Sequence, residues 1–206
     1  MPKDTFRNLP EDKQRRIFDA AVREFSEQPF RHASINRVVR DADIPRGSFY
    51  QYFSGKEDLY LYVIGEIGRE KAAAVREADA PPPGADFFET MLSMARISLD
   101  WARSNPVYNR IGMLLELDDS EFIAKFKAMS REGLAAIEAL IVRDQRRGLI
   151  RPELDPGFLL DVCYSINMKL LSDHYRSGGS DEALMEKLTA VIDLMRKGAA
   201  NGHTAG

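Results

Sequence analysis

The sequence predicts an all-α protein, and three observations support this prediction. Apolar residues recur at the spacing of helices, and no segment shows the alternating pattern of a strand. Residues that start and end helices, including prolines and glycines, separate these periodic segments. A chain of 206 residues can bury roughly 70% of its unfolded surface, and its one cysteine excludes an internal disulfide framework. Packed helices must therefore hold the fold together.

The first predicted helix runs from Pro10 to about Gln28. A proline suits the first turn of a helix, and the acidic residues that follow it complement the helix dipole. Its apolar stripe includes Ile17 and Phe25, which we expect to pack against the next two helices. Residues 1–9, which precede this helix, are expected to form a mobile arm.

Two short helices joined by a tight turn are predicted in residues 34–53. Ser34 is a good N-cap for the first of them, and residues 42–45 form the turn. The apolar residues at helical spacing are Ile35, Val38 and Val39 in the first helix and Phe49 and Phe53 in the second. Two such helices at a steep angle form a helix-turn-helix, whose second helix enters the major groove of DNA.

The second helix of this motif has an outward face that suits a polyanion. Phe49 and Phe53 attach the helix to the rest of the domain. The residues left to face outward are Arg46, Gly47, Ser48, Tyr50, Gln51 and Tyr52. They include no acid, and phosphates are bound by arginines, hydroxyls and backbone N–H groups at helix N-termini. Residues 1–56 hold 11 Lys and Arg against 8 Asp and Glu, so this part of an otherwise acidic chain can approach DNA.

Residues 46–59 resemble the DNA-reading signature of the TetR family of bacterial repressors. The upstream positions that also match this family are Ile17, Ala20, Ala21, Phe25 and Ser34. The resemblance covers about the first third of the chain. It implies a helix-turn-helix domain joined by a long helix to a C-terminal helical domain for ligand binding and dimerisation. We therefore expect a transcriptional regulator, a ligand-responsive repressor that binds a palindromic operator as a homodimer.

The resemblance also implies roles for residues of the motif. Arg46 and Gln51 are expected to contact bases, and Gly47 is expected to allow close approach. The residues expected to contact phosphates are Ser34, Ser48, Tyr50, Tyr52 and Lys56.

Four other cations near the motif have more than one interpretation. Arg37 lies one turn from the start of its helix and is a candidate DNA contact, whereas Arg40 can pair with Asp41 or with a second nearby aspartate. Lys3 and Arg7 can touch DNA as minor-groove arms do, although a terminus without contacts is the simpler expectation.

Two positions depart from the family pattern. Asp43 stands where a glycine is usual, but an aspartate tolerates the left-handed conformation that a glycine would supply. Pro45 stands where a serine or threonine is usual, and a proline cannot make the hydroxyl or N–H contact to a phosphate. We therefore expect the turn to form and one phosphate contact to be missing.

A long connecting helix is predicted from about Gly55 to Ala78. Ser54 and Glu57 match a capping box at its start. Lys56 lies in the first turn, where the helix dipole disfavours a cation unless a phosphate binds there. A solvated lysine is the alternative.

Five helices are predicted after the proline-rich break at residues 80–85. They span about 86–104, 106–117, 118–147, 156–178 and 181–197. The predicted domains are a DNA-binding domain at 1–55, a connecting helix at 56–79, a ligand-binding and dimerisation domain at 86–197 and a disordered tail at 198–206.

The C-terminal helices hold seven of the eight methionines, together with several aromatic residues. Such surfaces adapt to varied apolar ligands, so the resemblance leads us to expect a cavity for an apolar small-molecule effector. A plain packed core explains each residue equally well. The candidate lining residues are Met91, Met94, Ala95, Trp101, Tyr108, Met113, Phe126, Met129 and Met168. Gly133 is expected to allow close approach of a neighbouring helix.

The last two predicted helices carry long apolar stripes. Their members are Phe158, Val162, Ile166, Leu170, Leu184, Leu188, Val191 and Met195. The resemblance implies that these helices meet their symmetry mates in a four-helix bundle across a two-fold axis. A single-chain helical bundle is the alternative.

No pattern typical of an enzyme or a metal site is present. His32, His174 and His203 are scattered, and neither a phosphate-binding loop nor a nucleophile motif occurs. Helix capping explains the acidic cluster at residues 116–121 better than a metal site does. We therefore expect no catalysis and no cofactor. The alternatives are a helical interaction or enzyme domain with a vestigial helix-turn-helix, or an activator.

The sequence also predicts where the protein works. No run approaches the ~18 apolar residues of a membrane span, and the N-terminus lacks the apolar core of a signal peptide. Cys163 lies in an apolar helical run, which favours a buried and reduced thiol. We expect a cytoplasmic protein without a membrane partner.

Overall fold

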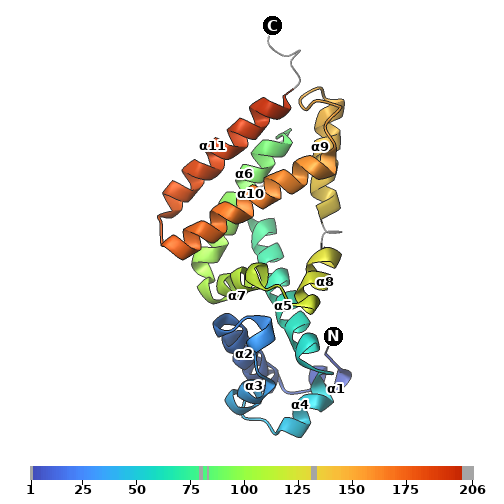
Figure 1. Cartoon of the computed structure of the whole chain (residues 1–206). Helices are drawn as coiled ribbons and strands as arrows, with labels where there is room; N and C mark the ends of the chain where they lie inside the picture. The colour runs from blue at the N-terminus through green and yellow to red at the C-terminus, as the bar shows by residue number, and fades with distance from the viewer. Residues whose placement is uncertain (1, 79–80, 83, 131–133, 201–206) are drawn as a thin grey trace. The chain divides into compact units, whose positions relative to one another are not determined.

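A computed structural model describes residues 2–78, 81–82, 84–130 and 134–200, except for the side chains of residues 129 and 130. Within these ranges every regular element is a helix, apart from one isolated antiparallel bridge between Ile150 and Ala200 (Figure 1). The predicted all-α fold is confirmed. No helix in the described part of the chain is long and apolar enough to cross a membrane.

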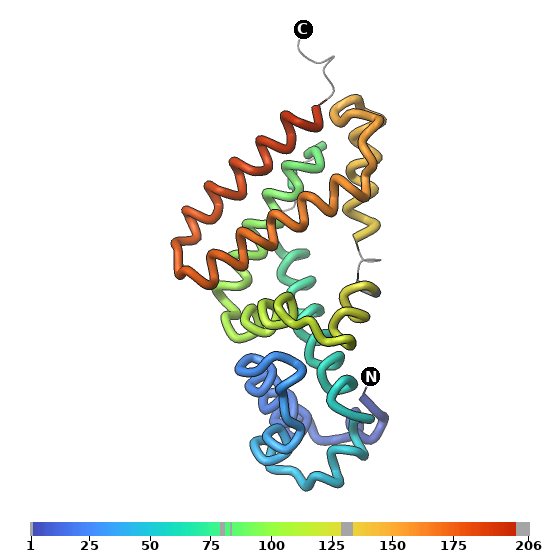
Figure 2. Tube along the Cα trace, in the orientation of Figure 1, coloured from blue at the N-terminus to red at the C-terminus, as the bar shows by residue number. Residues whose placement is uncertain are grey.

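The described residues form a succession of helices, as the trace in Figure 2 shows. The N-terminal elements are α1 (Asp4–Arg7), α2 (Glu11–Glu27), η1 (Phe30–His32), α3 (Ile35–Asp41), α4 (Arg46–Tyr52) and α5 (Lys56–Glu77). The C-terminal elements are α6 (Phe87–Ser104), α7 (Pro106–Leu117), α8 (Glu121–Ser130), α9 (Ala135–Arg146), α10 (Pro156–Ser177) and α11 (Asp181–Ala199).

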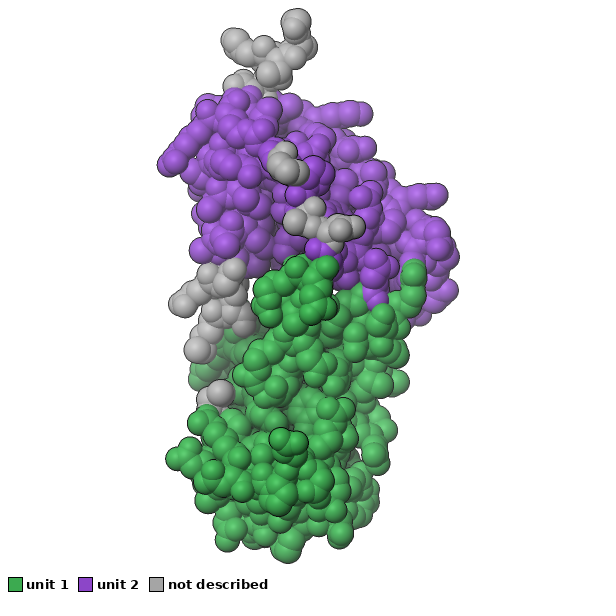
Figure 3. All heavy atoms as spheres, turned by 180° about the vertical axis from the view of Figure 1, so that it is seen from behind, with its two compact units in different colours: residues 1–77, 101–128 green, residues 78–100, 129–206 purple. Residues whose placement is uncertain are grey.

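The chain forms two compact units, which Figure 3 distinguishes by colour. Unit 1 comprises residues 1–77 and 101–128, and unit 2 comprises residues 78–100 and 129–206. The predicted domains differ from this division, because they placed residues 101–128 in the C-terminal domain. Those residues belong to unit 1, since the fully buried Ile111 and Ile123 complete its core.

Aromatic rings dominate the core of unit 1. The ring centroids of Phe53, at the end of α4, and Tyr62 of α5 are 5.8 Å apart, and Phe25 of α2 meets Tyr60 of α5 at 4.8 Å. Each such pair contributes about 0.5–1.5 kcal/mol beyond the burial of its area. These contacts attach α4 and α2 to the long helix α5, so the helix-turn-helix has a packed scaffold behind it.

The N-terminal segment is ordered, and the prediction of a mobile arm at residues 1–9 is wrong. Residues 4–7 form α1, and the side chain of Phe6 is 1% exposed. The ring centroid of Phe6 lies 4.9 Å from that of Phe53 and 5.1 Å from that of Tyr62. A single aromatic residue fills this site without any periodic pattern, so the sequence offered no signal for it.

The prediction of a single helix from 118 to 147 is wrong as well. The structure has two helices there, α8 and α9, and the boundary between the two units falls between residues 128 and 129. Gly133, expected to allow close helix approach, lies outside the described residues.

The prediction of a disordered tail at residues 198–206 is wrong for residues 198–200. Gly198 and Ala199 belong to α11, and the Ala199 carbonyl accepts a hydrogen bond from Arg151 N at 2.9 Å. Residues 201–206 of the predicted tail lie outside the described residues.

Side-chain caps start α6, α10 and α11 in unit 2. Glu89 N donates to Asp86 Oδ1 at 2.8 Å, and Asp86 N donates to Glu89 Oε2 at 2.9 Å, which is a reciprocal capping box for α6. Asp155 accepts a hydrogen bond from Phe158 N at 2.7 Å at the start of α10, and the hydroxyl of Ser180 caps α11.

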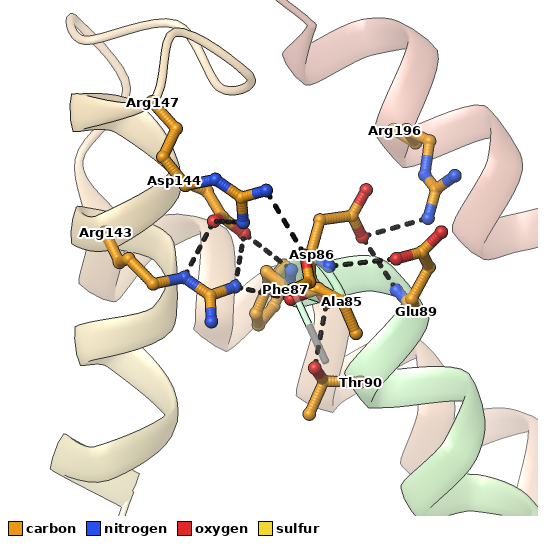
Figure 4. A network of polar contacts seen from close by, with 10 residues as sticks. Ala85, Asp86, Phe87, Glu89, Thr90, Arg143, Asp144, Arg147 and Arg196 are labelled. Carbon is orange, nitrogen blue, oxygen red and sulfur yellow. Dashed lines mark hydrogen bonds and ion pairs between the residues drawn. The ribbon is translucent and has the colours of Figure 1, made fainter. Parts of the chain in front are cut away.

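An ionic network around Asp144 joins α9 to the start of α6 (Figure 4). Asp144 is fully buried. It accepts hydrogen bonds from Phe87 N at 2.6 Å, Arg143 Nε at 2.9 Å and Arg147 Nη1 at 3.0 Å. Burial acts to raise the pKa of Asp144, but these hydrogen bonds and the charge of Arg143 hold it below its usual value. The carboxylate therefore remains ionised and orients the start of α6.

Candidate DNA-binding site

The predicted helix-turn-helix is present as α3, a turn and α4, all within unit 1. In the turn, Ala42 N donates to Val38 O at 2.9 Å and Ile44 N donates to Val39 O at 3.0 Å. Asp43 has a φ of 52°, the left-handed conformation that we expected an aspartate to tolerate. The turn therefore forms without the glycine that is usual there.

Helix α4 separates an inward apolar face from an outward polar one. Phe49 and Phe53 are fully buried, as predicted. The outward residues are Arg46, Gly47, Ser48, Tyr50 and Gln51, all exposed except the half-buried Ser48. Because α4 contains no acid, this face offers only hydroxyl, amide and guanidinium groups to a partner.

Tyr52 faces inward, and the prediction that it faces outward is wrong. Its side chain is 6% exposed, and its ring centroid lies 6.3 Å from that of Phe6. The ammonium of Lys13 lies 5.6 Å from the centroid of the same ring. Position 52 is three residues after Phe49 and shares its helical face, which was the signal available in the sequence. Tyr52 therefore supports α4 from within.

Gly47 leaves open space at the start of α4. The residue is exposed, and a Cβ placed there would meet no atom within 4 Å. The packing of the protein itself therefore does not require a glycine, and an alanine would favour the helix. The close approach of DNA expected at Gly47 stays a prediction.

Glu24 of α2 is 5% exposed and holds the start of α3. Its carboxylate accepts hydrogen bonds from Ser34 N at 2.6 Å and from Nε and Nη2 of Arg37 at 2.7 and 2.5 Å. The hydrogen bond to Glu24 raises the pKa of Arg37. Arg37, a candidate DNA contact, thus has an internal partner. Ser34 occupies the N-cap position as predicted, but its hydroxyl makes no capping hydrogen bond.

Arg40 follows one of the two interpretations that the sequence left open. Its Nε donates to Asp41 Oδ1 at 2.8 Å on the surface of unit 1. This pair accounts for Arg40 without DNA.

Lys56 at the start of α5 binds the backbone of its own unit. Its ammonium donates to Arg31 O at 3.2 Å and Ala33 O at 3.1 Å, and lies 4.6 Å from the ring centroid of Phe30. Burial lowers the pKa of Lys56. These carbonyls offset the unfavourable position of a cation at a helix start, so the protein alone accounts for what we attributed to a phosphate.

The cap of α5 differs by one residue from the predicted capping box. Ser54 N donates to Asp58 Oδ2 at 3.0 Å, whereas Glu57 was expected to accept this bond. Because α5 begins at Lys56, Asp58 is its third residue, the position from which an acid reaches back.

The acidic cluster at residues 116–121 contacts η1 within unit 1. Asp118 is 5% exposed and accepts hydrogen bonds from Ser120 N at 2.8 Å and Arg31 N at 3.4 Å. Asp119 Oδ1 lies 3.0 Å from Arg31 Nη2. Burial acts to raise the pKa of Asp118, but the hydrogen bonds from Ser120 and Arg31 lower it overall. The sequence predicted capping here and missed the contact with Arg31.

The residues predicted to line an effector cavity are divided between the two units. Trp101, Tyr108, Met113 and Phe126 belong to unit 1, and Met91, Met94, Ala95, Met129 and Met168 belong to unit 2. The ring centroids of Trp101 and Tyr108 are 6.2 Å apart with 26° between the planes, and both rings pack against the core of unit 1. The ammonium of Lys71 lies 5.4 Å from the ring centroid of Trp101. Burial lowers the pKa of Lys71. These two rings therefore have partners of their own.

The residues predicted for dimerisation lie partly on the surface and partly in the core. Phe158 is 64% exposed, whereas Leu184 and Leu188 are 3% and 1% exposed. The last two pack against Leu99 inside unit 2, so the prediction that they face a partner is wrong. The half-buried members are Val162, Ile166, Leu170, Val191 and Met195. The sequence missed Leu194, which is 71% exposed, because it lies outside the apolar stripe of α11.

Groups with metal-binding or thiol chemistry are scarce in the described ranges. No group of three or more His, Cys, Asp and Glu among the described residues could hold a metal ion. Cys163 is buried, and burial raises the pKa of its thiol to about 11, so the reactive thiolate is disfavoured. His174 Nε2 lies 2.9 Å from Asp181 Oδ1 at the junction of α10 and α11.

Comparison with known proteins points to the same region. A family model described as bacterial regulatory proteins, tetR family, matches residues 17–63, which run from α2 into α5. The HTH-type transcriptional regulator EthR of Mycolicibacterium smegmatis is 26% identical over 158 residues, which are 77% of this chain and 71% of that protein. The HTH-type transcriptional repressor AcnR of Corynebacterium efficiens is 24% identical over 193 residues, 91% of this chain and 95% of that protein.

Similarity extends to a solved structure over nearly the whole chain. A TetR family transcriptional regulator from Chloroflexus aurantiacus is 28% identical and superposes with a TM-score of 0.71, covering 97% of this chain and 99% of that one. The match therefore includes both units and not the motif alone. The chain belongs to the TetR family of bacterial regulatory proteins and is a DNA-binding transcriptional regulator of the helix-turn-helix type.

Proposed function

We propose that this protein is a repressor that binds a palindromic operator as a homodimer and leaves it when a small apolar molecule binds. The observation that supports DNA reading is the outward face of α4, which carries exposed Arg46, Tyr50 and Gln51 and no acid. Arginine and glutamine donate to base edges in the major groove, and hydroxyls donate to phosphates. Arg46 and Gln51 therefore contact bases, while Ser48 and Tyr50 contact phosphates.

Dimerisation uses α10 and α11, which pack against each other in unit 2. Phe158 and Leu194 are 64% and 71% exposed on these helices. Burying such a side chain stabilises an interface by about 1.5–3 kcal/mol. A two-fold dimer then presents two copies of α4 to two half-sites about one helical turn of DNA apart.

The effector binds in unit 2 among Met91, Met94 and Met168, which are half-buried. Methionine side chains adapt to apolar ligands of varied shape. An effector that binds more tightly to the dimer form that does not fit the operator shifts the population toward that form and releases DNA. The protein acts in the cytoplasm, where its DNA lies.

Selection of bound sequences from a pool of random-sequence duplexes tests DNA reading. We expect an inverted repeat with half-sites about 10 bp apart. The double variant Arg46→Ala with Tyr50→Ala should enrich nothing, whereas Lys125→Ala, which also removes one surface cation of unit 1, should enrich the wild-type sequence. If wild type enriches no sequence at about 0.15 M salt, the proposed function fails.

Solution mass tests the dimer. Wild type should have twice the 23.3 kDa mass of the chain, and Phe158→Glu with Leu194→Glu should reduce it to 23.3 kDa. Leu117→Glu is the matched control, because Leu117 is 59% exposed on α7 in unit 1. A monomeric wild type, or a dimer that survives the double variant, contradicts the assignment of this surface.

Thermal-shift screening of fatty acyl, aromatic and cationic compounds tests the effector. A ligand at 100 times its Kd stabilises the folded state by about 2.7 kcal/mol. The same compound should release the selected duplex and restore transcription from a promoter that contains it. Activation of that promoter by the ligand-free protein would instead identify an activator.

A further inference from the structure

The last turn of α4 is capped by the N-terminal segment of the chain. The last four carbonyls of a helix have no partner within the helix, and in α4 they belong to residues 49–52. Phe49 O accepts a hydrogen bond from Phe53 N at 2.9 Å, where the chain leaves the helix. The other three carbonyls accept hydrogen bonds from residues 3 and 5.

Lys3 and Thr5 supply these three bonds. Lys3 Nζ donates to Tyr50 O at 2.8 Å, and Lys3 N donates to Tyr52 O at 2.9 Å. The hydroxyl of Thr5 donates to Gln51 O. Every C-terminal carbonyl of α4 therefore has a donor.

Lys3 also matches the electrostatics of the helix end. The C-terminus of a helix carries a partial negative charge, which a nearby cation stabilises. The last turn of α4 contains no basic residue of its own. The ammonium of Lys3 thus provides the positive charge that the helix lacks.

Phe6 anchors this capping segment. Its side chain is 1% exposed and packs against the rings of Phe53 and Tyr62, so the segment cannot leave α4 without exposing an aromatic ring. Arg7, the other cation of the segment, pairs with Asp4 at 3.7 Å. The capping role therefore belongs to Lys3 and not to every cation nearby.

We propose that Lys3 and Thr5 are positioning residues for DNA recognition. They hold the backbone of Tyr50 and Gln51, and so fix the direction of two side chains that contact DNA. This inference rests on the proposed function of the outward face of α4. It differs from a minor-groove arm, because the ammonium of Lys3 is bound to the recognition helix and not to a phosphate.

Removing the two side-chain donors, the Lys3 ammonium and the Thr5 hydroxyl, tests this proposal. Lys3→Met and Thr5→Val eliminate them with little change in side-chain volume, and a C-terminal tag leaves the segment undisturbed. The double variant should bind the duplex selected by wild type about tenfold more weakly, because two hydrogen bonds that order the last turn are lost. Thr5→Ser, which keeps the hydroxyl, and Arg7→Met should bind like wild type.

Two further measurements separate positioning from direct contact. A dimer that loses one phosphate contact per subunit shows a change of about 1.8 in the slope of log K against log salt concentration, whereas positioning leaves the slope unchanged. In the free protein, the amides of residues 50–53 should exchange with solvent faster in the double variant than in Arg7→Met.

The outcomes are distinguishable from a failure of the proposed function. If wild type selects no duplex, DNA reading itself fails. If wild type binds its duplex and the double variant binds equally well, positioning is overturned. A weaker affinity with a reduced salt slope and unchanged amide exchange also overturns it, because Lys3 then contacts a phosphate.

Discussion

Replacing Gly47 by alanine should stabilise the protein and weaken its binding to DNA. Gly47 is the second residue of α4, is exposed, and offers open space to a Cβ, with no atom within 4 Å. Alanine is about 0.8–1.0 kcal/mol more favourable than glycine in a helix interior, and the gain is smaller near an end. We expect the free energy of unfolding to rise by about 0.5 kcal/mol and Tm by about 2 °C.

On DNA, the same methyl group would occupy space that the nucleic acid needs. Forcing an extra methyl group into a close-packed site costs about 1–3 kcal/mol. A cost of about 1.4 kcal/mol per recognition helix is tenfold in affinity, so a dimer with two such helices should bind about a hundredfold more weakly. The two effects have opposite signs, which excludes general destabilisation as the cause of weak binding.

Urea unfolding and fluorescence anisotropy with the selected duplex measure the two effects. Gly65→Ala in α5 is the matched control, because a Cβ there also meets nothing within 4 Å and Gly65 lies outside the motif. It should stabilise the protein and leave DNA affinity unchanged. If Gly47→Ala binds as tightly as Gly65→Ala, DNA does not approach Gly47 closely and the reasoning is refuted.

Three further predictions concern buried partners and the face of α4. Asp144→Asn should lower the free energy of unfolding at pH 7 by about 2 kcal/mol, the scale for losing charge-assisted hydrogen bonds, because Arg143 and Arg147 are themselves 40% and 42% exposed. The folded pKa of Asp144 lies below its unfolded value of about 3.9, so its contribution is present above that pH and is lost as pH falls through the folded pKa. The difference between wild type and variant in urea unfolding should therefore shrink in acid, and a constant difference down to about pH 2 would contradict this cause. Glu24→Gln keeps the shape of the side chain that pairs with Arg37 but removes its charge. It should lower the free energy of unfolding by about 1–2 kcal/mol. An unchanged Tm would show that this ion pair does not stabilise the fold. In anisotropy titrations, Tyr52→Phe should leave DNA affinity unchanged, whereas Tyr50→Phe should lower it about fivefold. Equal losses of affinity in the two variants would show that Tyr52 contacts DNA.

The helix-turn-helix could be predicted because its signals are local. The spacing of Phe49 and Phe53, the turn around Asp43 and the acid-free outward face each depend on residues within one or two helical turns. The caps at Asp86 and Asp155 were predictable for the same reason, since a capping side chain bonds to a backbone group three residues away.

The pairings of charged residues could not be predicted. Glu24 pairs with Arg37, and Lys3 caps α4, which lies more than forty residues further along the chain. In a chain with 29 Lys and Arg and 32 Asp and Glu, local patterns do not select one partner for each charge. The sequence therefore assigned Arg37 to DNA and left the N-terminal segment without a role.

The all-α class, the positions of most helices and the polar outward face of α4 can be read from the sequence, because periodicity and caps are properties of neighbouring residues. The three-dimensional structure was needed to show that residues 101–128 belong with the DNA-binding unit, that Tyr52 and Leu188 are buried, and that the N-terminal segment caps the recognition helix. An apolar stripe shows that a helix has a buried face but not what covers it. That depends on which distant side chains fill the remaining space and satisfy the remaining backbone groups.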